Sequence, residues 1–433
     1  MFGPLERGVM DTIFALATAQ GKAGVAVIRI SGPQSFELST ILCGELPLDR
    51  KMGVRSIRAN DGTLLDQALV LLFPEGQSFT GEATVELQLH GSIAVVRAVL
   101  AAISDTGLAR VAEPGEFTRR ALLNERLDLT QVEGLSDLIE AETEVQRREA
   151  MRSFDGALRD MIEGLRANLI RAAALLEATI DFADEEVPEN VYPEVENLLK
   201  DATKTISSEI SRSGAAQSVR KGFEVAIIGP PNVGKSTLLN TLAGREAAIT
   251  SEIAGTTRDI VEVRMDIQGL PVTFLDTAGV RETDDPIEKL GVARAVERAQ
   301  AAELRVILLE RPDADPIMPP CEGDIVVSTK HDIYGVGISA LNGTGLNELL
   351  SEISDRLGDL TADIGLISRE RDRVALSESY SRLCLVQENL LHMPSELLTA
   401  EIYGAVQSLG AVIGRVGVED VLDEIFASFC LGK

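Results

Sequence analysis

The stretch GPPNVGKS at residues 229–236 constrains the fold of this chain more than any other feature of its sequence. It fits the pattern GxxxxGK[ST], in which a glycine-rich loop points successive backbone N–H groups at phosphate oxygens. The loop follows the apolar run FEVAIIG and precedes STLLNTLAG, a helix pattern. The sequence therefore predicts an α/β sheet in which this loop joins a buried strand to a helix and binds a nucleotide.

Two side chains of the loop carry the expected chemistry. Lys235 supplies a positive charge to the β and γ phosphates, and the Ser236 hydroxyl is placed to hold Mg²⁺. The other loop residues expected to contact the nucleotide are Asn232, Val233, Gly234 and Thr237.

From about residue 222 onward, strand and helix patterns alternate. The predicted strands are FEVAIIG, VEVRMDI, VTFLDTAG, LRVILLE, DIVVSTK and GVGISAL. Such alternation is typical of a mostly parallel, doubly wound sheet.

Two later loops favour GTP over ATP. STKHD (328–332) matches the [NT]KxD pattern, in which the aspartate, here Asp332, accepts hydrogen bonds from the guanine edge. The stem of Lys330 is expected along the base, and Thr329 replaces a commoner asparagine, which removes one amide contact. SAL (339–341) resembles the loop whose backbone N–H meets the guanine oxygen, which assigns Ser339 and Ala340 to the site.

Two further segments match the switch regions of a GTPase. In GTTRD (255–259), Thr257 is expected to ligate Mg²⁺ in the triphosphate state, although a threonine-rich turn explains this motif alone equally well. In DTAG, Asp276 is expected to act through a water on the metal and Gly279 on the γ-phosphate, with Thr277 and Ala278 beside them. Val280 follows where Ras-type enzymes have a water-orienting glutamine, so another group must position the water.

Length and composition limit the number of domains and the classes of ligand and location that this chain can have. The 433 residues suffice for two to four domains, and the net charge of −27 disfavours nonspecific binding to a phosphate backbone. No apolar run is long enough to cross a membrane, and the N-terminus lacks the pattern of a signal peptide. The four cysteines are far apart, which argues against a zinc site and fits a reducing cytoplasm.

The chain divides by pattern into four segments. Residues 1–118 mix strands (GVAVIRI, ALVLLF, ATVELQLHG) with helix patterns and are predicted to be α+β. Residues 119–216 and 370–433 have apolar residues at helical spacing, and the predicted α/β unit, 217–369, lies between them. We expect the two helical segments to pack together around the insertion.

Four quoted stretches, spread along the chain, resemble one family. MDTIFALATAQGKAGVAVIRISGP, SFTGEATVELQLHG, EPGEFTRRALLNERLDLTQVE and the terminal FCLGK are similar to the MnmE/TrmE tRNA-modification GTPases. The resemblance implies a cytoplasmic homodimer whose subunits combine an N-terminal tetrahydrofolate-binding and dimerisation domain, a discontinuous helical domain and an inserted Ras-like P-loop GTPase domain. It also implies potassium-activated GTP hydrolysis and an FAD-dependent MnmG/GidA-type partner, in a heterotetramer. The product is an aminomethyl or carboxymethylaminomethyl group on the wobble uridine of certain tRNAs, with a one-carbon unit from 5-formyl- or methylene-tetrahydrofolate.

The resemblance also assigns roles to residues of this chain. Glu288 matches the glutamate that orients the attacking water. The positions that match the potassium site are Asn232, Ser251, Ile253 and Thr256; Ser251 and Thr256 also join the nucleotide site. The folate positions are Arg29, Glu86, Arg126 and Lys433, with Arg126 where the family commonly has lysine. Cys430 is expected near the folate, either for chemistry or as a small buried side chain.

Two features depart from the family pattern, and one alternative function stays open. The short proline-rich segment ERPDADPIMPPCEGDIVV, together with Thr329, predicts weak nucleotide affinity with fast turnover. A regulatory GTPase switch in ribosome assembly is the alternative function. Such switches usually carry an RNA-binding appendage, a KH domain with its GxxG loop on a basic surface, and the sequence displays no such appendage.

Overall fold

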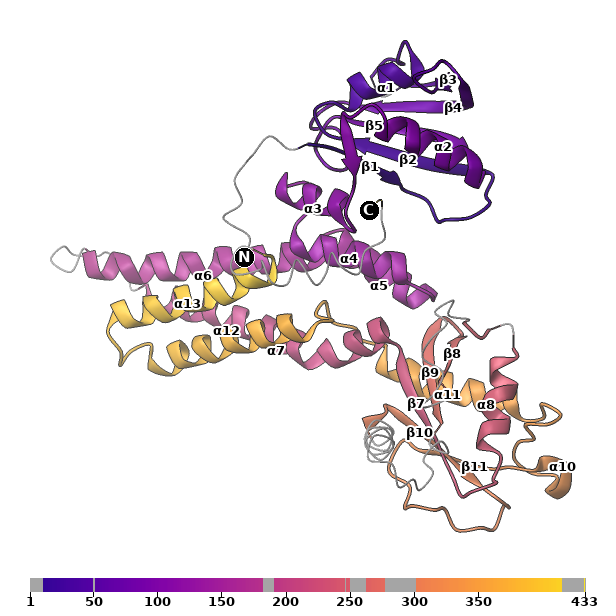
Figure 1. The fold of residues 1–433 in the computed structure, drawn as a ribbon. Coiled ribbons are helices and arrows are strands. Elements are labelled where there is room, and N and C mark those ends of the chain that lie inside the picture. Colours follow the sequence, from indigo (N-terminus) through magenta and orange to yellow (C-terminus); the bar gives the residue numbers. More distant parts are fainter. Residues whose placement is uncertain are drawn as a thin grey trace, which may run out of the picture. The chain divides into compact units, whose positions relative to one another are not determined.

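The computed structural model describes residues 11–49, 51–181, 191–245, 247–249, 262–276, 301–414 and Gly432. The chain forms two compact units, residues 1–133 with 414–433 and residues 134–413, which are described separately (Figure 1). Among the described helices, none is both long and apolar enough to cross a membrane.

The first unit contains a six-stranded sheet with the order β3-β4-β5-β2-β1-β6. Neighbouring strands are antiparallel, except that β1 and β6 are parallel. The runs GVAVIRI, ALVLLF and ATVELQLHG, predicted to be strands, are confirmed as β2, β4 and β5. The strands are β1 (Thr12–Leu16), β2 (Val25–Ser31), β3 (Met52–Arg58), β4 (Leu64–Phe73), β5 (Thr84–His90) and β6 (Ala109–Val111).

Side chains that alternate along the strands give this sheet two different faces. One face, with Ile28 and Leu87, packs against Leu38 of α1 and Val99 of α2 and forms the main core of the unit. The other face holds a smaller cluster that includes Phe117 of α3. The helices are α1 (Ser35–Cys43), α2 (Ile93–Ser104) and α3 (Glu116–Leu123), followed by α4 (Leu129–Glu140), which extends into the second unit.

In the second unit, two distant segments of the chain share one helical core. Leu169, Ile206, Leu383 and Leu409 come from four helices and are all fully buried in the same cluster. Figure 1 shows these helices, α6, α7, α12 and α13, lying side by side. The helices are α5 (Glu144–Phe154), α6 (Ala157–Asp181), α7 (Tyr192–Lys221), α12 (Glu370–Asn389) and α13 (Ser395–Val412).

The α/β part of this unit is a five-stranded sheet with the order β11-β10-β7-β9-β8. Its pairs are parallel except at the edge, where β8 is antiparallel to β9. A central β7 flanked by parallel neighbours is what the buried run FEVAIIG predicts. The elements are β7 (Phe223–Ile228), α8 (Lys235–Ala243), β8 (Glu262–Ile267), β9 (Leu270–Asp276), β10 (Leu304–Leu309), β11 (Ile325–Ser328), α10 (His331–Tyr334) and α11 (Leu346–Leu360).

One predicted strand is wrong. GVGISAL (335–341) forms no strand, although five of the six predicted runs do. Gly335 and Gly337 adopt positive φ angles of 71° and 83°, which interrupt an extended conformation. Ile338 still bonds to the end of β11, by donating its N–H to the Ser328 carbonyl at 2.8 Å. The segment is therefore a glycine-bent loop.

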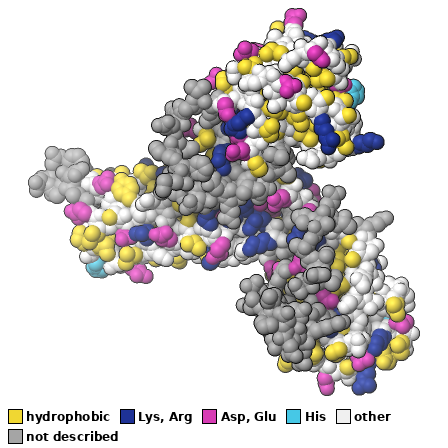
Figure 2. Space-filling view, viewed as in Figure 1, with side chains coloured by type: hydrophobic (Ala, Val, Ile, Leu, Met, Phe, Trp, Pro, Cys, Tyr) yellow, Lys and Arg dark blue, Asp and Glu magenta, His cyan; other side chains and the backbone are white. Residues whose placement is uncertain are grey.

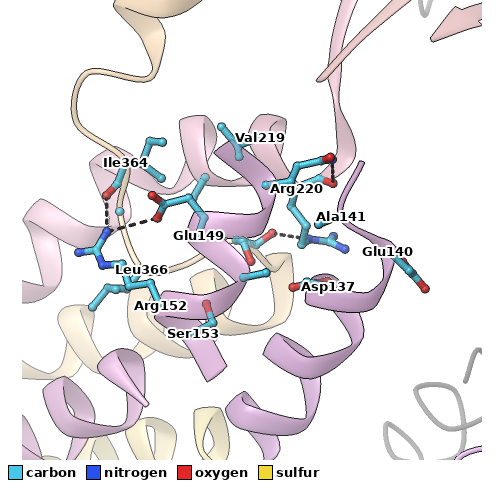
Figure 3. Close-up of a pocket in the computed structure, with 15 residues that line it drawn as sticks. Asp137, Glu140, Ala141, Glu149, Arg152, Ser153, Val219, Arg220, Ile364 and Leu366 are labelled. Carbon is cyan, nitrogen blue, oxygen red and sulfur yellow. Dashed lines mark hydrogen bonds and ion pairs between the residues drawn. The ribbon is translucent and has the colours of Figure 1, made fainter. Parts of the chain in front are cut away.

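The chain passes between the helices and the α/β part at two neighbouring places, after α7 and before α12. Arg220 Nε donates to the Ser368 carbonyl at 3.3 Å, which ties the two passages together. Arg152 of α5 donates to the Ile364 carbonyl at 3.3 Å, and Arg369 pairs with Asp137 of α4. Figure 3 shows the pocket beside these contacts, whose lining includes Asp137, Arg152, Arg220 and Ile364. Its volume is about 70 Å³.

Candidate nucleotide and folate sites

The phosphate loop between β7 and α8 has the backbone that its sequence predicts. A Cβ atom at Gly229 would lie 2.9 Å from the Leu308 carbonyl oxygen, so only glycine fits there. Asn232 and Gly234 have positive φ angles of 61° and 107°, and α8 begins at the next residue, Lys235. Asparagine tolerates this left-handed region better than most residues. The chain thus curls tightly around the N-terminus of α8, a position that favours anions.

Lys235 lies inside this loop and is only 7% exposed. Its Nζ donates to the carbonyl oxygens of Gly229 at 2.5 Å and Pro230 at 3.0 Å. Burial lowers the pKa of the Lys235 ammonium below its usual value, and the negative charge of Asp276 opposes part of this shift. The loop therefore holds a partly desolvated positive charge, which binds phosphate oxygens strongly.

Ser236 and Asp276 lie together at the end of the sheet. The Ser236 hydroxyl donates to Oδ2 of Asp276 at 3.1 Å. Asp276 reaches this place because β9 pairs with β7 in parallel, with Ile227 opposite Asp276. Hydroxyl and carboxylate oxygens are the ligands that Mg²⁺ prefers, so this donor pair fits the predicted metal.

The TKHD segment follows β11 at the same edge of the sheet. Thr329 donates to the Leu309 carbonyl with both its N–H (2.8 Å) and its hydroxyl (3.1 Å), so its side chain is bound to β10. Lys330 has a φ of 59°, a strained conformation that recurs at ligand-binding loops. Its Nζ lies 2.9 Å from Glu310, and this contact raises the pKa of Lys330.

The SAL loop bonds to the TKHD segment and to the helix of the phosphate loop. The Ser339 hydroxyl donates to Oδ1 of Asp332 at 3.0 Å, and Ser339 is fully buried. Ala340 accepts a hydrogen bond of 2.8 Å from the Thr241 hydroxyl of α8. Neither Thr241 nor Glu310 belongs to a recognisable motif, so the sequence alone does not point to either residue.

Two of the predicted folate residues form a pair in the first unit. Arg29 of β2 lies opposite Glu86 of β5 in the sheet register, and their side chains form an ion pair of 2.9 Å. The Arg29 guanidinium also lies 5.5 Å from the ring centre of Phe79 and 5.7 Å from that of Phe117. The pair therefore lies on the face of the sheet that carries α3, beside the two aromatic rings.

Arg126 and Gly432 are also placed in this unit. Arg126 packs beside Gly81, two residues from Phe79, because a Cβ atom at Gly81 would lie 3.2 Å from its Cγ. Gly432 is buried, with a φ of 97°, and a Cβ atom there would lie 2.2 Å from the Leu16 carbonyl oxygen. The penultimate residue thus contacts the end of β1 so closely that only glycine fits.

The other predicted site residues lie outside the described part of the chain. They are Ser251, Ile253, Thr256, Thr257, Thr277, Ala278, Gly279, Glu288, Cys430 and Lys433.

Comparison with known proteins assigns the chain to a family. A family model described as the MnmE helical domain matches residues 129–430, and one described as the GTP-binding protein TrmE N-terminus matches residues 12–126. The chain belongs to the MnmE/TrmE family. A relative from Roseobacter denitrificans named tRNA modification GTPase MnmE is 54% identical over 98% of this chain and 100% of its own length. One of the same name from Dinoroseobacter shibae is 52% identical, with the same coverage of both chains.

Solved structures resemble parts of this MnmE/TrmE chain. A single-residue variant of Era from Aquifex aeolicus, bound to GDP and AlF4⁻, is 29% identical over 37% of this chain and 67% of its own, with a TM-score of 0.25. The G domain of the FeoB iron transporter from T. maritima is 22% identical over 31% of this chain and 98% of its own, with a TM-score of 0.22.

The arginines on α5 and α6 of this MnmE/TrmE chain are paired with acids. Figure 2 shows positive and negative side chains intermixed over the described part of the surface it displays. These helices therefore present alternating charges, unlike the single-sign surface typical of phosphate-backbone binding. The pairs are Arg147–Glu144, Arg148–Glu149, Arg152–Glu149, Arg159–Asp160, Arg166–Glu163 and Arg171–Glu194.

Proposed function

We propose that this protein is a Mg²⁺-dependent GTP hydrolase that acts in tRNA modification. The observation that carries the proposal is the convergence of Lys235, Ser236, Asp276 and Asp332 at one end of the five-stranded sheet, in loops whose motifs occur in the order of a GTPase. In open parallel sheets, ligands bind at this end of the strands. The family's name supplies the second half of the proposal, since the relatives are named tRNA modification GTPases.

Each side chain of the site has a definite task in this proposal. Lys235 and the N–H groups of the phosphate loop neutralise and orient the β and γ phosphates. Ser236 and, through water, Asp276 hold Mg²⁺, which supplies positive charge to the β- and γ-phosphate oxygens. Asp332 accepts hydrogen bonds from guanine, and the N–H of Ala340 donates to its oxygen.

The finer mechanism follows from the resemblance. Thr257 is proposed as a further Mg²⁺ ligand, and Glu288 orients the attacking water in place of the missing glutamine. Asn232, Ser251, Ile253 and Thr256 hold a potassium ion, which supplies the charge that an arginine finger supplies elsewhere. This site is completed when the G domains of two subunits meet face to face.

The tRNA-modification half of the proposal combines a folate derivative, a second copy of this chain, an FAD-dependent protein and the tRNA. Arg29, Glu86, Arg126 and Lys433 bind a tetrahydrofolate derivative in the N-terminal domain, assigned to residues 1–118. A homodimer associates with an FAD-dependent MnmG/GidA-type protein in the cytoplasm and modifies the wobble uridine of certain tRNAs. GTP hydrolysis in the G domains (217–369) drives opening and closing of the dimer, which gates one-carbon transfer from folate to the tRNA uridine.

The hydrolase is tested by steady-state GTP hydrolysis of the full chain. We expect the rate per subunit to rise with protein concentration in KCl and to be much lower in NaCl at equal ionic strength. Lys235→Ala is expected to lose roughly a hundredfold or more of the activity, while Lys204→Ala, an exposed lysine on α7, retains it. Equal rates in the two salts contradict the potassium site, and an active Lys235→Ala protein contradicts the nucleotide site.

The tRNA role has its own test. Cells that lack their own family member are supplied with this gene, and their tRNA nucleosides are analysed by mass spectrometry. We expect the modified wobble uridine to return with the wild-type gene and not with Lys235→Ala. GTP hydrolysis in vitro without any change in tRNA nucleosides contradicts the modification role and favours a regulatory switch.

A further inference from the structure

We propose that Thr241 is a positioning residue for guanine recognition. Thr241 lies on α8, the helix that starts at the phosphate loop, and its hydroxyl donates to the Ala340 carbonyl. This bond keeps the SAL loop in position to contact the base. The inference rests on the proposed GTP site, and adds to it a residue outside every motif of that site.

The position of Thr241 follows from the geometry of α8. The helix begins at Lys235, and at 1.5 Å per residue the six residues to Thr241 advance it by about 9 Å. Thr241 is half-buried, and its Oγ1 lies 2.8 Å from the carbonyl oxygen of Ala340, which is 99 residues away in sequence. One helix therefore contacts the phosphate end of the nucleotide site at its start and the guanine end near its finish.

The bond to Ala340 acts on the group that is expected to read the base. The Ala340 N–H is assigned to the guanine oxygen, and a hydrogen bond to the carbonyl of the same residue restrains its orientation. The Thr241 hydroxyl has a single proton, and the Thr237 carbonyl of its own helix lies 2.9 Å away as a competing acceptor. The hydroxyl therefore donates to one of the two carbonyls at a time, and its oxygen lies within hydrogen-bond distance of both.

The other hydrogen bonds of the SAL loop, among the residues that the structure describes, do not reach α8. The Ser339 hydroxyl donates to the Asp332 carboxylate, and the Ser339 N–H donates to the Thr344 carbonyl. The Gly343 N–H donates to the Ser339 carbonyl. These bonds fix the shape of the loop and its link to Asp332, on the guanine side. Thr241 adds the link between that side and the phosphate side.

The position of the SAL loop matters in this chain because the TKHD segment lacks one amide contact to the nucleotide. Thr329 stands where an asparagine amide is commoner, and the Thr329 hydroxyl is bound to Leu309 on β10. Arg245, two residues after the end of α8, donates from Nη1 to Asn347 of α11 at 2.8 Å. This contact does not involve Thr241, so we expect it to persist when the Thr241 bond is removed.

The test uses the full chain with Thr241→Val, which keeps the shape and removes the hydroxyl. We expect KM for GTP to rise roughly five- to tenfold, as loss of one hydrogen bond predicts, while kcat changes less than about twofold because the phosphate end is untouched. Thr241→Ser restores the hydroxyl and is expected to restore KM. The matched control is Thr205→Val on α7, whose hydroxyl also donates four residues back along its helix.

A modified nucleotide separates positioning from general stability. In 6-thio-GTP, sulfur replaces the guanine oxygen and accepts hydrogen bonds poorly, so the wild type is expected to prefer GTP. The preference should shrink in Thr241→Val, because the N–H that reads this atom is no longer held in place. The proposal is overturned if Thr241→Val leaves KM for GTP unchanged or greatly lowers kcat. It is also overturned if Thr241→Val weakens GTP and 6-thio-GTP equally and Thr241→Ser does not restore KM. If instead the wild type hydrolyses no GTP, the proposed function itself fails.

Discussion

The Ser236 hydroxyl donates a 3.1 Å hydrogen bond to Oδ2 of Asp276, which joins the first turn of α8 to the last residue of β9. The contact exists because two parallel strands, β7 and β9, end side by side. It brings a hydroxyl from the phosphate loop and a carboxylate from the DTAG segment to one point beside Lys235, whose pKa the same carboxylate influences. The two predicted metal-site residues are therefore organised by the sheet itself.

Replacement of Asp276 by asparagine tests this arrangement. The amide keeps the size of the side chain but removes the charge that attracts Mg²⁺ and its water. We expect the Mg²⁺ concentration for half-maximal GTP hydrolysis to rise roughly ten- to a hundredfold. Asp266→Asn is the matched control, because Asp266 accepts the Gly269 N–H at the opposite end of β9. A Mg²⁺ titration that is the same for Asp276→Asn and wild type would remove Asp276 from the metal site.

Glu288→Ala addresses the water that Val280 cannot orient. We expect kcat to fall by roughly two orders of magnitude, with little change in the affinity for a non-hydrolysable GTP analogue, because a catalyst of the chemical step contributes little to ground-state binding. Single-turnover hydrolysis and fluorescent-nucleotide binding measure the two quantities. Glu282→Ala, another acid of the same stretch, controls for the loss of charge. Unchanged turnover in Glu288→Ala rules out this glutamate as the water-orienting group.

Local motifs made much of the nucleotide site predictable from sequence. GPPNVGKS predicts the turn and the helix start, since the positive φ angles of Asn232 and Gly234 belong to a few adjacent residues. GVGISAL misled the prediction because its apolar spacing suits a strand, while the actual loop depends on the positive φ angles of Gly335 and Gly337.

Contacts between residues far apart in the sequence cannot be predicted from local sequence patterns. The family resemblance assigns Arg29 and Glu86 to folate, but their direct contact depends on the register of β2 and β5, which no local pattern specifies. The Thr241–Ala340 bond likewise depends on how α8 packs against a loop 99 residues later. Such contacts become visible only after tertiary structure is known.

Arg29→Gln tests the folate half of the proposal. Removing the guanidinium eliminates the charge that would meet a carboxylate of folate, and it leaves Glu86 without its ion pair. We expect the dissociation constant for 5-formyl-tetrahydrofolate, measured by calorimetry, to rise roughly tenfold or more, with GTP hydrolysis unchanged. Arg58→Gln on β3, an exposed arginine of the same sheet, is the control. Equal folate affinity in wild type and Arg29→Gln would show that Arg29 only supports the sheet.

Glu116, the first residue of α3, lies at the centre of a charged network that fastens this helix to the sheet. It accepts hydrogen bonds from Arg110 at 2.6 and 2.8 Å and from Arg120 at 2.9 Å. Burial alone would raise the pKa of Glu116, but Arg110, the Glu113 N–H and Arg120 together lower it below its usual 4.5. A carboxyl whose pKa is lowered by folding stabilises the folded state above its unfolded pKa and stops doing so as the pH falls through its folded pKa.

Glu116→Gln should therefore destabilise this unit by roughly 2 kcal/mol at pH 7, the magnitude of hydrogen bonds to charged groups. The difference from wild type should begin to shrink as the pH falls below about 4.5, where the unfolded carboxyl takes up a proton, and should vanish once the pH falls through the lower folded pKa of Glu116. Hydrogen exchange of amides in β1 and α3 measures the free energy of opening at each pH, independently of the second unit. Glu37→Gln, at an exposed acid in the first turn of α1, is expected to have little effect at any pH. A Glu116→Gln effect that is constant with pH would mean that the amide disturbs packing and that the charge contributes nothing.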